Sequence, residues 1–137
     1  MAIHWNKTSK YKNTKYTYLG IKFDSLKECR RYTELRLLEQ AGKIKDLELQ
    51  KAYELIPAQY EETAEIYTKG IRKGEPKQGK LLERACYYVA DFYYIDCETG
   101  KTVVEDVKGY RDGGAYALFS VKRKLMLYIY HIKVKEL

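Results

Sequence analysis

The sequence predicts an α+β fold, in which a mixed central sheet of about four strands is flanked by helices. Two apolar segments around a polar turn indicate a β-hairpin in the second half of the chain, and a helix-start signal lies well upstream of it. A helical pattern and a last strand pattern follow the hairpin. The chain has 137 residues, which is enough for one domain with a core and short for two. We therefore expect a single domain over residues 17–137.

The basic composition favours a polyanionic partner. The chain has 26 Lys and Arg against 19 Asp and Glu, a formal charge of +7, so nucleic acid is the first expectation. Residues 1–16 are basic and polar and are expected to form either a flexible arm along phosphates or a disordered tail. Residues 68–80 are rich in Gly, Pro and Lys and are expected to form a mobile loop. The expected DNA-binding cations are Lys7, Lys10, Lys12, Lys15, Lys73, Lys77, Lys80 and Arg111.

The cysteine and histidine content restricts the possible metal chemistry. Cys29, Cys86 and Cys97 form no CxxC pair, which argues against a disulfide framework and a zinc site. With only His4 and His131 available, a bound metal would take oxygen ligands, which favours Mg²⁺ or Mn²⁺. The sequence shows no signal peptide and no apolar segment of about 18 residues, so we expect a cytoplasmic location.

The first helix is predicted from a capping box. After a short hairpin expected at Thr17–Phe23, Ser25 is placed as N-cap and Glu28 at the third helical position, with Gly42 after the helix end. On a helical wheel, Glu28 falls inside the apolar stripe instead of on the polar face. Two interpretations of Glu28 therefore stay open, a helix cap alone or a cap that also serves a site.

One long strand or two shorter ones are expected at Ile44–Ile56, ending before Pro57. Gln50 is its most notable polar residue. It is interpreted either as a surface glutamine or as an accessory residue of a site.

The central hairpin consists of Arg84–Ile95 and Thr102–Lys108, joined by a turn at residues 97–100. Each strand carries a carboxylate among apolar neighbours, Asp91 in the first and Asp106 in the second. The plain interpretation is an exposed hairpin face with scattered charges. The apolar residues on both sides of Asp91 favour a central strand with a functional carboxylate instead.

The turn length sets which residues face each other. A four-residue loop pairs positions whose numbers sum to 197 and places Asp91 opposite Asp106, whereas an odd loop would pair Asp91 with Glu105. In the first register Lys108 shares the face of Asp106, while Glu105 and Val107 point to the other face. Opposed carboxylates repel, so we expect a compensating divalent cation and, without it, a raised pKa of at least one carboxyl group.

The C-terminal part is expected to form a loop at Gly109–Gly114, a helix over Ala115–Leu125 and a last strand at Tyr128–Lys135. Lys122 falls within the predicted apolar stripe of the helix, where it either extends its amine to solvent in a structural role or serves a site. The residues of this stripe are Ala115, Leu118, Phe119, Val121 and Leu125.

A helix bearing Glu28, then Asp91 in one strand and Asp106-Val107-Lys108 in the next, resembles the PD-(D/E)XK nuclease superfamily. The nearest resemblance is to small phage-encoded members classed as a domain of unknown function. It extends from Tyr18 to about Glu136 and departs from the motif at Ala90, where the superfamily name has proline.

This resemblance implies a restriction-endonuclease-like core and Mg²⁺-dependent hydrolysis of DNA phosphodiester bonds, of structure-selective or nicking type. The setting would be phage DNA replication or recombination in the bacterial host cytoplasm, with a homodimer as one option. It implies that Asp91, Asp106 and the Val107 carbonyl bind the metal with Glu28 as a further ligand, and that Lys108 positions or activates water. Accessory candidates are Gln50, Glu105 and Lys122. The alternative is a non-catalytic DNA-binding or architectural protein that retains the fold.

Overall fold

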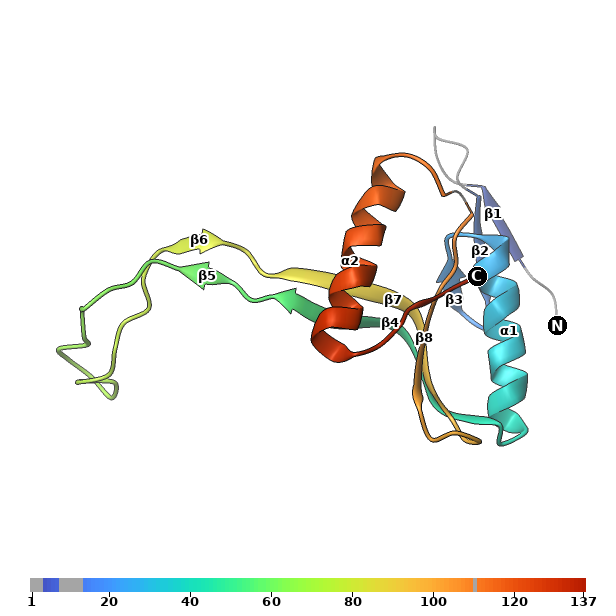
Figure 1. The fold of residues 1–137 in the computed structure, drawn as a ribbon, viewed down its shortest axis with the longest axis horizontal. Helices are drawn as coiled ribbons and strands as arrows, with labels where there is room; N and C mark the ends of the chain where they lie inside the picture. Colours follow the sequence, from blue (N-terminus) through green and yellow to red (C-terminus); the bar gives the residue numbers. More distant parts are fainter. Residues whose placement is uncertain (1–3, 8–13, 110) are drawn as a thin grey trace. The chain divides into compact units, whose positions relative to one another are not determined.

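The computed structural model describes residues 4–7, 14–109 and 111–137 and divides into two compact units. The main unit comprises residues 1–51 and 89–137, and the ribbon unit comprises Ala52–Tyr88. Strands β4 and β7 run through both units (Figure 1). The expected single domain over residues 17–137 is thus described as two units.

A four-stranded mixed sheet carries the fold. Its strand order is β4-β7-β8-β9, with β7 and β8 antiparallel and β8 and β9 parallel. With two helices beside it, the sheet confirms the predicted α+β class. The strands are β4 (Ile44–Ile56), β7 (Cys86–Asp96), β8 (Thr102–Asp106) and β9 (Lys135–Glu136).

The register of the β7–β8 hairpin is the predicted one. Phe92 faces Glu105 and Ile95 faces Thr102, so the two residue numbers of each facing pair sum to 197. The alternative with an odd loop is therefore wrong. One further step along both strands places Asp91 opposite Asp106, the last residue of β8.

Helix α1 (Leu26–Gln40) begins and ends where the capping signals predict. The Ser25 hydroxyl accepts a hydrogen bond from the Glu28 backbone N–H at 3.1 Å, and Gly42 follows the helix with a φ of 74°. The Glu28 carboxylate accepts from the Asp24 N–H at 3.4 Å, one residue earlier than a standard capping box would have it. Figure 1 shows α1 alongside β2 and β3, which it contacts.

A small antiparallel sheet of order β1-β2-β3 lies within the N-terminal segment. Tyr18 faces Ile21 across a turn at Leu19-Gly20, which confirms the predicted short hairpin. The expected arm at residues 1–16 includes β1 and the start of β2, while residues 1–3 and 8–13 lie outside the described residues. The strands are β1 (His4–Lys7), β2 (Thr14–Tyr18) and β3 (Ile21–Phe23).

The hydrophobic core joins α1 to the sheet and to β3. Its apolar side chains come from alternate positions of the strands and from one face of the helix, as the two periodicities require. The buried members are Phe23, Cys29, Tyr32, Leu35, Ile44, Phe92, Tyr94 and Val107.

Helix α2 (Gly114–Tyr130) is longer than predicted and ends at His131, which adopts a left-handed conformation with a φ of 58°. The predicted strand at Tyr128–Lys135 is therefore wrong except for Lys135, because the helix continues through Tyr130 and β9 begins only at Lys135. Aromatic and β-branched residues raise strand propensity, but tertiary context overrides it here.

The predicted apolar stripe of α2 is also wrong for most of its members. Leu118 and Val121 are 57% and 54% exposed, whereas Phe119 and Met126 are buried. Arg123 also holds the helix to β9. Its guanidinium donates a hydrogen bond to the Glu136 carboxylate of that strand at 3.1 Å.

The ribbon unit is an antiparallel ribbon that includes β5 (Gln59–Tyr60) and β6 (Leu81–Glu83), paired with a register shift. Backbone hydrogen bonds continue the pairing, from the Glu61 N–H to the Lys80 carbonyl at 2.8 Å and from the Lys77 N–H to the Glu65 carbonyl at 3.0 Å. The sequence predicts a mobile loop at residues 68–80. In the structure these residues form the end of the ribbon and part of one of its two paired segments.

Candidate functional site

Asp91 and Asp106 meet at the end of the central hairpin. Asp106 is only 5% exposed, and Asp91 is half-buried opposite it. The Asp91 Oδ2 accepts a hydrogen bond from the Val107 backbone N–H at 2.8 Å. This bond ties the segment that leaves β8 to the Asp91 side chain, so the two carboxyl groups are held on one face of the sheet.

The pKa of Asp91 is raised to about 7. Burial is the largest cause, followed by repulsion from Asp106, while the Val107 N–H lowers the pKa and Glu28 raises it further. The sequence led us to expect a raised pKa from opposed charges, but desolvation of Asp91 contributes more. Without a cation, burial and the neighbouring acids therefore favour the protonated form of this carboxyl group.

Lys108 is fixed beside Asp106, on the face that the register predicts. Its Nζ lies 2.8 Å from Asp106 Oδ1 and 3.7 Å from the centroid of the Phe119 ring of α2. The Lys108 carbonyl accepts a hydrogen bond from Lys27 Nζ at 3.1 Å. The ammonium is thus positioned by a carboxylate and an aromatic ring at once.

Glu28 faces the same carboxylates from the first turn of α1. Its pKa is raised, first by burial and then by Asp24 and Asp106, although the Asp24 N–H and Lys108 lower it. Glu28 and Asp91 both line a cavity of about 150 Å³. Its lining residues are Ile21, Lys22, Phe23, Asp24, Glu28, Leu49, Gln50, Asp91 and Phe92.

Gln50 reaches the site through an irregular point of β4. Its Nε2 donates to Asp91 Oδ1 at 3.4 Å, and its backbone has a φ of 52°, a left-handed value that a glutamine rarely adopts. This conformation departs from regular strand geometry. Gln50 is exposed, as the surface interpretation expected, and its side chain also contacts Asp91, so the accessory role stays a prediction.

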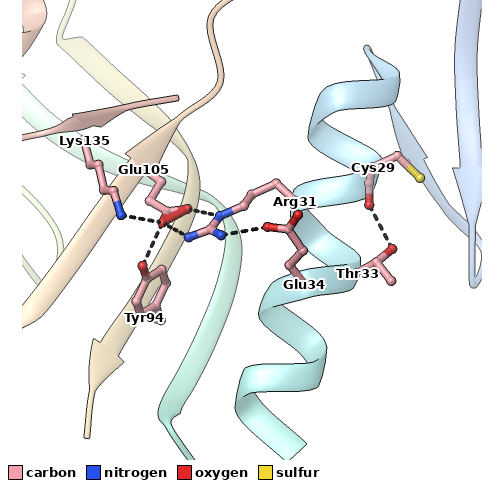
Figure 2. A network of polar contacts seen from close by, with 7 residues as sticks. All are labelled: Cys29, Arg31, Thr33, Glu34, Tyr94, Glu105 and Lys135. Atoms are coloured by element: carbon pink, nitrogen blue, oxygen red, sulfur yellow. Dashed lines mark hydrogen bonds and ion pairs between the residues drawn. The ribbon is translucent and has the colours of Figure 1, made fainter. Parts of the chain in front are cut away.

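Glu105 belongs to a separate ion-pair network on the opposite face of β8 (Figure 2). It is fully buried and accepts from Arg31 Nε at 2.8 Å and from the Tyr94 hydroxyl at 2.7 Å, with Lys135 Nζ at 3.9 Å. Its second oxygen also bonds the Arg31 guanidinium, which makes the pair bidentate. Among the predicted site residues, Glu28, Gln50 and Asp91 line the Asp91 cavity. Four others are not among its lining residues, namely Asp106, Lys108, Glu105 and the half-buried Lys122.

The expected DNA-binding cations are distributed over both units. Lys15 lies 3.7 Å from Asp24, Lys77 lies 4.0 Å from Glu65, and Arg111 is exposed. Lys7 belongs to β1, whereas Lys10 and Lys12 lie outside the described residues. Lys73 and Lys80 are exposed in the ribbon unit.

Sequence reasoning missed three residues around the site, namely Lys22, Lys27 and Phe119. Lys22 lines the cavity and Lys27 holds the Lys108 carbonyl, and both lie within six residues of Glu28 in the sequence. That proximity was an available signal. The sequence carries no such signal for Phe119, because an aromatic residue in an apolar helix is expected in the core.

The donor set suits a hard divalent cation. Asp91, Asp106 and Glu28 offer carboxylate oxygens, which Mg²⁺ and Mn²⁺ prefer. Among the described residues, no three His, Cys, Asp or Glu side chains gather closely enough to hold a metal by themselves. A cation here would therefore take further oxygen ligands from backbone carbonyls, water or a phosphate.

Residues 8–136 match the model of a family described as Protein of unknown function (DUF1064). The chain belongs to this family. The region matched to DUF1064 includes Glu28, Asp91, Asp106 and Lys108. No match was found among curated proteins or among solved structures. Within the described part of the chain, no helix is both long and apolar enough to cross a membrane.

Proposed function

We propose that this DUF1064 protein is a Mg²⁺-dependent endonuclease of the PD-(D/E)XK superfamily that hydrolyses DNA phosphodiester bonds. The observation that carries the proposal is the placement of Asp91, Asp106 and Lys108 on one face of the β7–β8 hairpin, with Lys108 Nζ 2.8 Å from Asp106. Two acids that can hold a metal, with a lysine beside them, suit metal-assisted phosphodiester hydrolysis.

Each residue has a role that follows from its contacts. Asp91 and Asp106, with Glu28, would hold Mg²⁺ or Mn²⁺, which when bound polarises the phosphate and lowers the pKa of an attacking water. Lys108, held by Asp106 and Phe119, donates to the scissile phosphate or positions the nucleophile. Gln50 orients the Asp91 carboxylate.

The charge of the main unit supports DNA as the substrate. The ribbon unit holds six Lys and Arg and six Asp and Glu, so the whole formal charge of +7 belongs to the main unit. Lys22 and Lys27 are exposed next to the site and can contact phosphates beside the scissile bond. We place the activity, of structure-selective or nicking type, in phage DNA replication or recombination in the bacterial cytoplasm.

The test is cleavage of supercoiled, linear and branched DNA with Mg²⁺, with Mn²⁺ and with EDTA. We expect cleavage only with metal, and its loss by orders of magnitude in Asp91→Ala, Asp106→Ala and Lys108→Ala, because each removes transition-state stabilisation worth several kcal/mol. Binding to DNA should survive in all three. The matched control is Glu98→Ala, which removes an exposed carboxylate from the turn of the same hairpin.

Cleavage by Asp106→Ala at a rate near wild type would contradict the assignment. Binding of all three DNA forms without cleavage, under every metal condition, would favour the alternative of a non-catalytic DNA-binding protein.

A further inference from the structure

We infer that the ribbon unit is a self-association surface, through which two copies of this chain pair ribbon to ribbon. This goes beyond the proposed endonuclease, since it assigns a partner to a part of the chain that holds none of the proposed catalytic residues.

The ribbon unit lacks a core of its own. Leu55 and Tyr88, at its two ends, are buried, but no residue of the segment 56–84 is. Its large apolar side chains are exposed instead, namely Ile56, Tyr60, Ile66, Ile71, Leu81, Leu82 and Tyr87. A two-stranded ribbon hides too little apolar surface to offset the conformational entropy lost on ordering. Large apolar side chains exposed in this number within one small unit are typical of an interaction site.

The ribbon nevertheless has a defined backbone structure. A Cβ added at Gly79 would lie 1.9 Å from the Glu61 carbonyl oxygen, so the two strand sides approach more closely than a side chain permits. Near the turn, Arg72 hydrogen-bonds to Glu75 at 2.8 Å and stacks on the Tyr67 ring. These features describe a built surface and not a flexible linker.

The net charge of the ribbon unit indicates which kind of partner it can bind. The ribbon is neutral overall, and two of its cations, Arg72 and Lys77, are matched by its own Glu75 and Glu65. DNA gains no net attraction from such a surface, whereas the main unit carries +7. Pairing of two chains through their main units would oppose +7 with +7. Two ribbons meet without that repulsion, and charges of both signs on one patch suit a two-fold interface.

The experiment measures the molar mass of the full chain by sedimentation equilibrium over a range of concentrations. We expect a reversible dimer. Leu82→Glu should raise the dimer dissociation constant about tenfold or more, because it places a charge in an apolar contact. The matched control is Leu118→Glu on α2, since Leu82 and Leu118 are 56% and 57% exposed. The control should leave the dissociation constant unchanged.

Hydrogen exchange of the wild-type protein gives a second readout that needs no variant. Amides of β5 and β6 should exchange more slowly at concentrations where the dimer forms than at those where it dissociates. A wild-type monomer at every concentration, or equal exchange rates, would overturn the inference. So would dissociation by Leu118→Glu alone, or a Leu82→Glu protein that remains dimeric but binds DNA more weakly. None of these readouts depends on cleavage, so they fail or succeed separately from the proposed endonuclease.

Discussion

Asp91 is the residue at which three parts of the main unit meet. It accepts hydrogen bonds from Val107, which follows β8, and from Gln50 of β4, and it faces Asp106 across the hairpin. Burial and the neighbouring acids raise the pKa of its carboxyl group to about 7. A carboxyl group with a raised pKa beside a second acid is suited to exchanging its proton for a cation.

The raised pKa makes a prediction about stability without metal. Between about pH 4 and pH 7 the folded protein retains a proton on Asp91 that the unfolded chain has lost, so the free energy of unfolding should fall as pH rises through this range and level off above it. The fall due to this group is on the order of a few kcal/mol. Urea denaturation in EDTA at pH 5 and pH 8 measures it.

Asp91→Asn is the variant that isolates this effect, because it removes the titration at nearly constant shape. We expect it to show a smaller fall between the two pH values than wild type. An equal fall in both proteins would mean that Asp91 does not carry the raised pKa.

Glu28→Gln separates the two interpretations of Glu28. The glutamine oxygen can still accept from the Asp24 N–H, and the Ser25 cap is untouched, so stability should change by less than about 0.5 kcal/mol. Cleavage should nevertheless fall at least tenfold, because a carboxylate that faces Asp106 is lost. Thermal melts and cleavage rates measure the two effects. Full activity in a folded variant would leave Glu28 as a helix cap only.

At the level of elements, α1 connects the site to the core of the sheet. Its first turn carries Lys27 and Glu28 beside the site, and Arg31, one turn later, forms the bidentate pair with Glu105 on the other face of β8 (Figure 2). The hydrogen bonds to Glu105 raise the pKa of Arg31. This pair therefore fixes the helix against β8 and with it the position of Glu28.

Removal of Arg31 should be strongly destabilising. Arg31→Ala leaves the fully buried Glu105 with only Tyr94 and the more distant Lys135, which we expect to cost about 3–5 kcal/mol. Arg36→Ala is the control on the same helix, since its half-exposed pair with Glu39 should contribute less than about 1 kcal/mol. Urea denaturation measures both. Equal losses would contradict a special role of the buried pair.

At the scale of the whole molecule, charge and apolar surface are divided between the two units. The main unit holds the formal +7 and the candidate site, whereas the ribbon unit is neutral and exposes apolar side chains. Polyanion binding and self-association are thereby assigned to different surfaces of one chain.

This division predicts how DNA binding depends on salt. Lys22→Ala and Lys27→Ala should each lower the slope of log affinity against log salt concentration by about 1, because each removes one phosphate contact. Lys73→Ala, in the ribbon unit, should leave the slope unchanged. Fluorescence anisotropy in EDTA, at several salt concentrations, measures the slopes. A loss of slope with Lys73→Ala would make the ribbon part of the DNA interface, as the sequence alone suggested.

The sequence by itself determined the features that depend on local spacing. A four-residue turn and the alternation of strand side chains were enough to place Asp91 opposite Asp106 and Lys108 on their face. The Ser25 cap and the end of α1 also follow from nearby residues. These features depend on hydrogen bonds and side-chain directions within a few residues of chain or across one turn, which a sequence pattern records directly.

Only the tertiary structure decided which side of each element is covered. Leu118 and Phe119 are both apolar, yet only Phe119 is buried, where it contacts Lys108. Glu105 and Asp106 are adjacent acids, yet one is held by Arg31 from a helix 74 positions away in sequence and the other by Lys108. The burial of Phe119 and the pairing of Glu105 with Arg31 depend on contacts between different elements of the fold, and local periodicity carries no information about which partner arrives at which face.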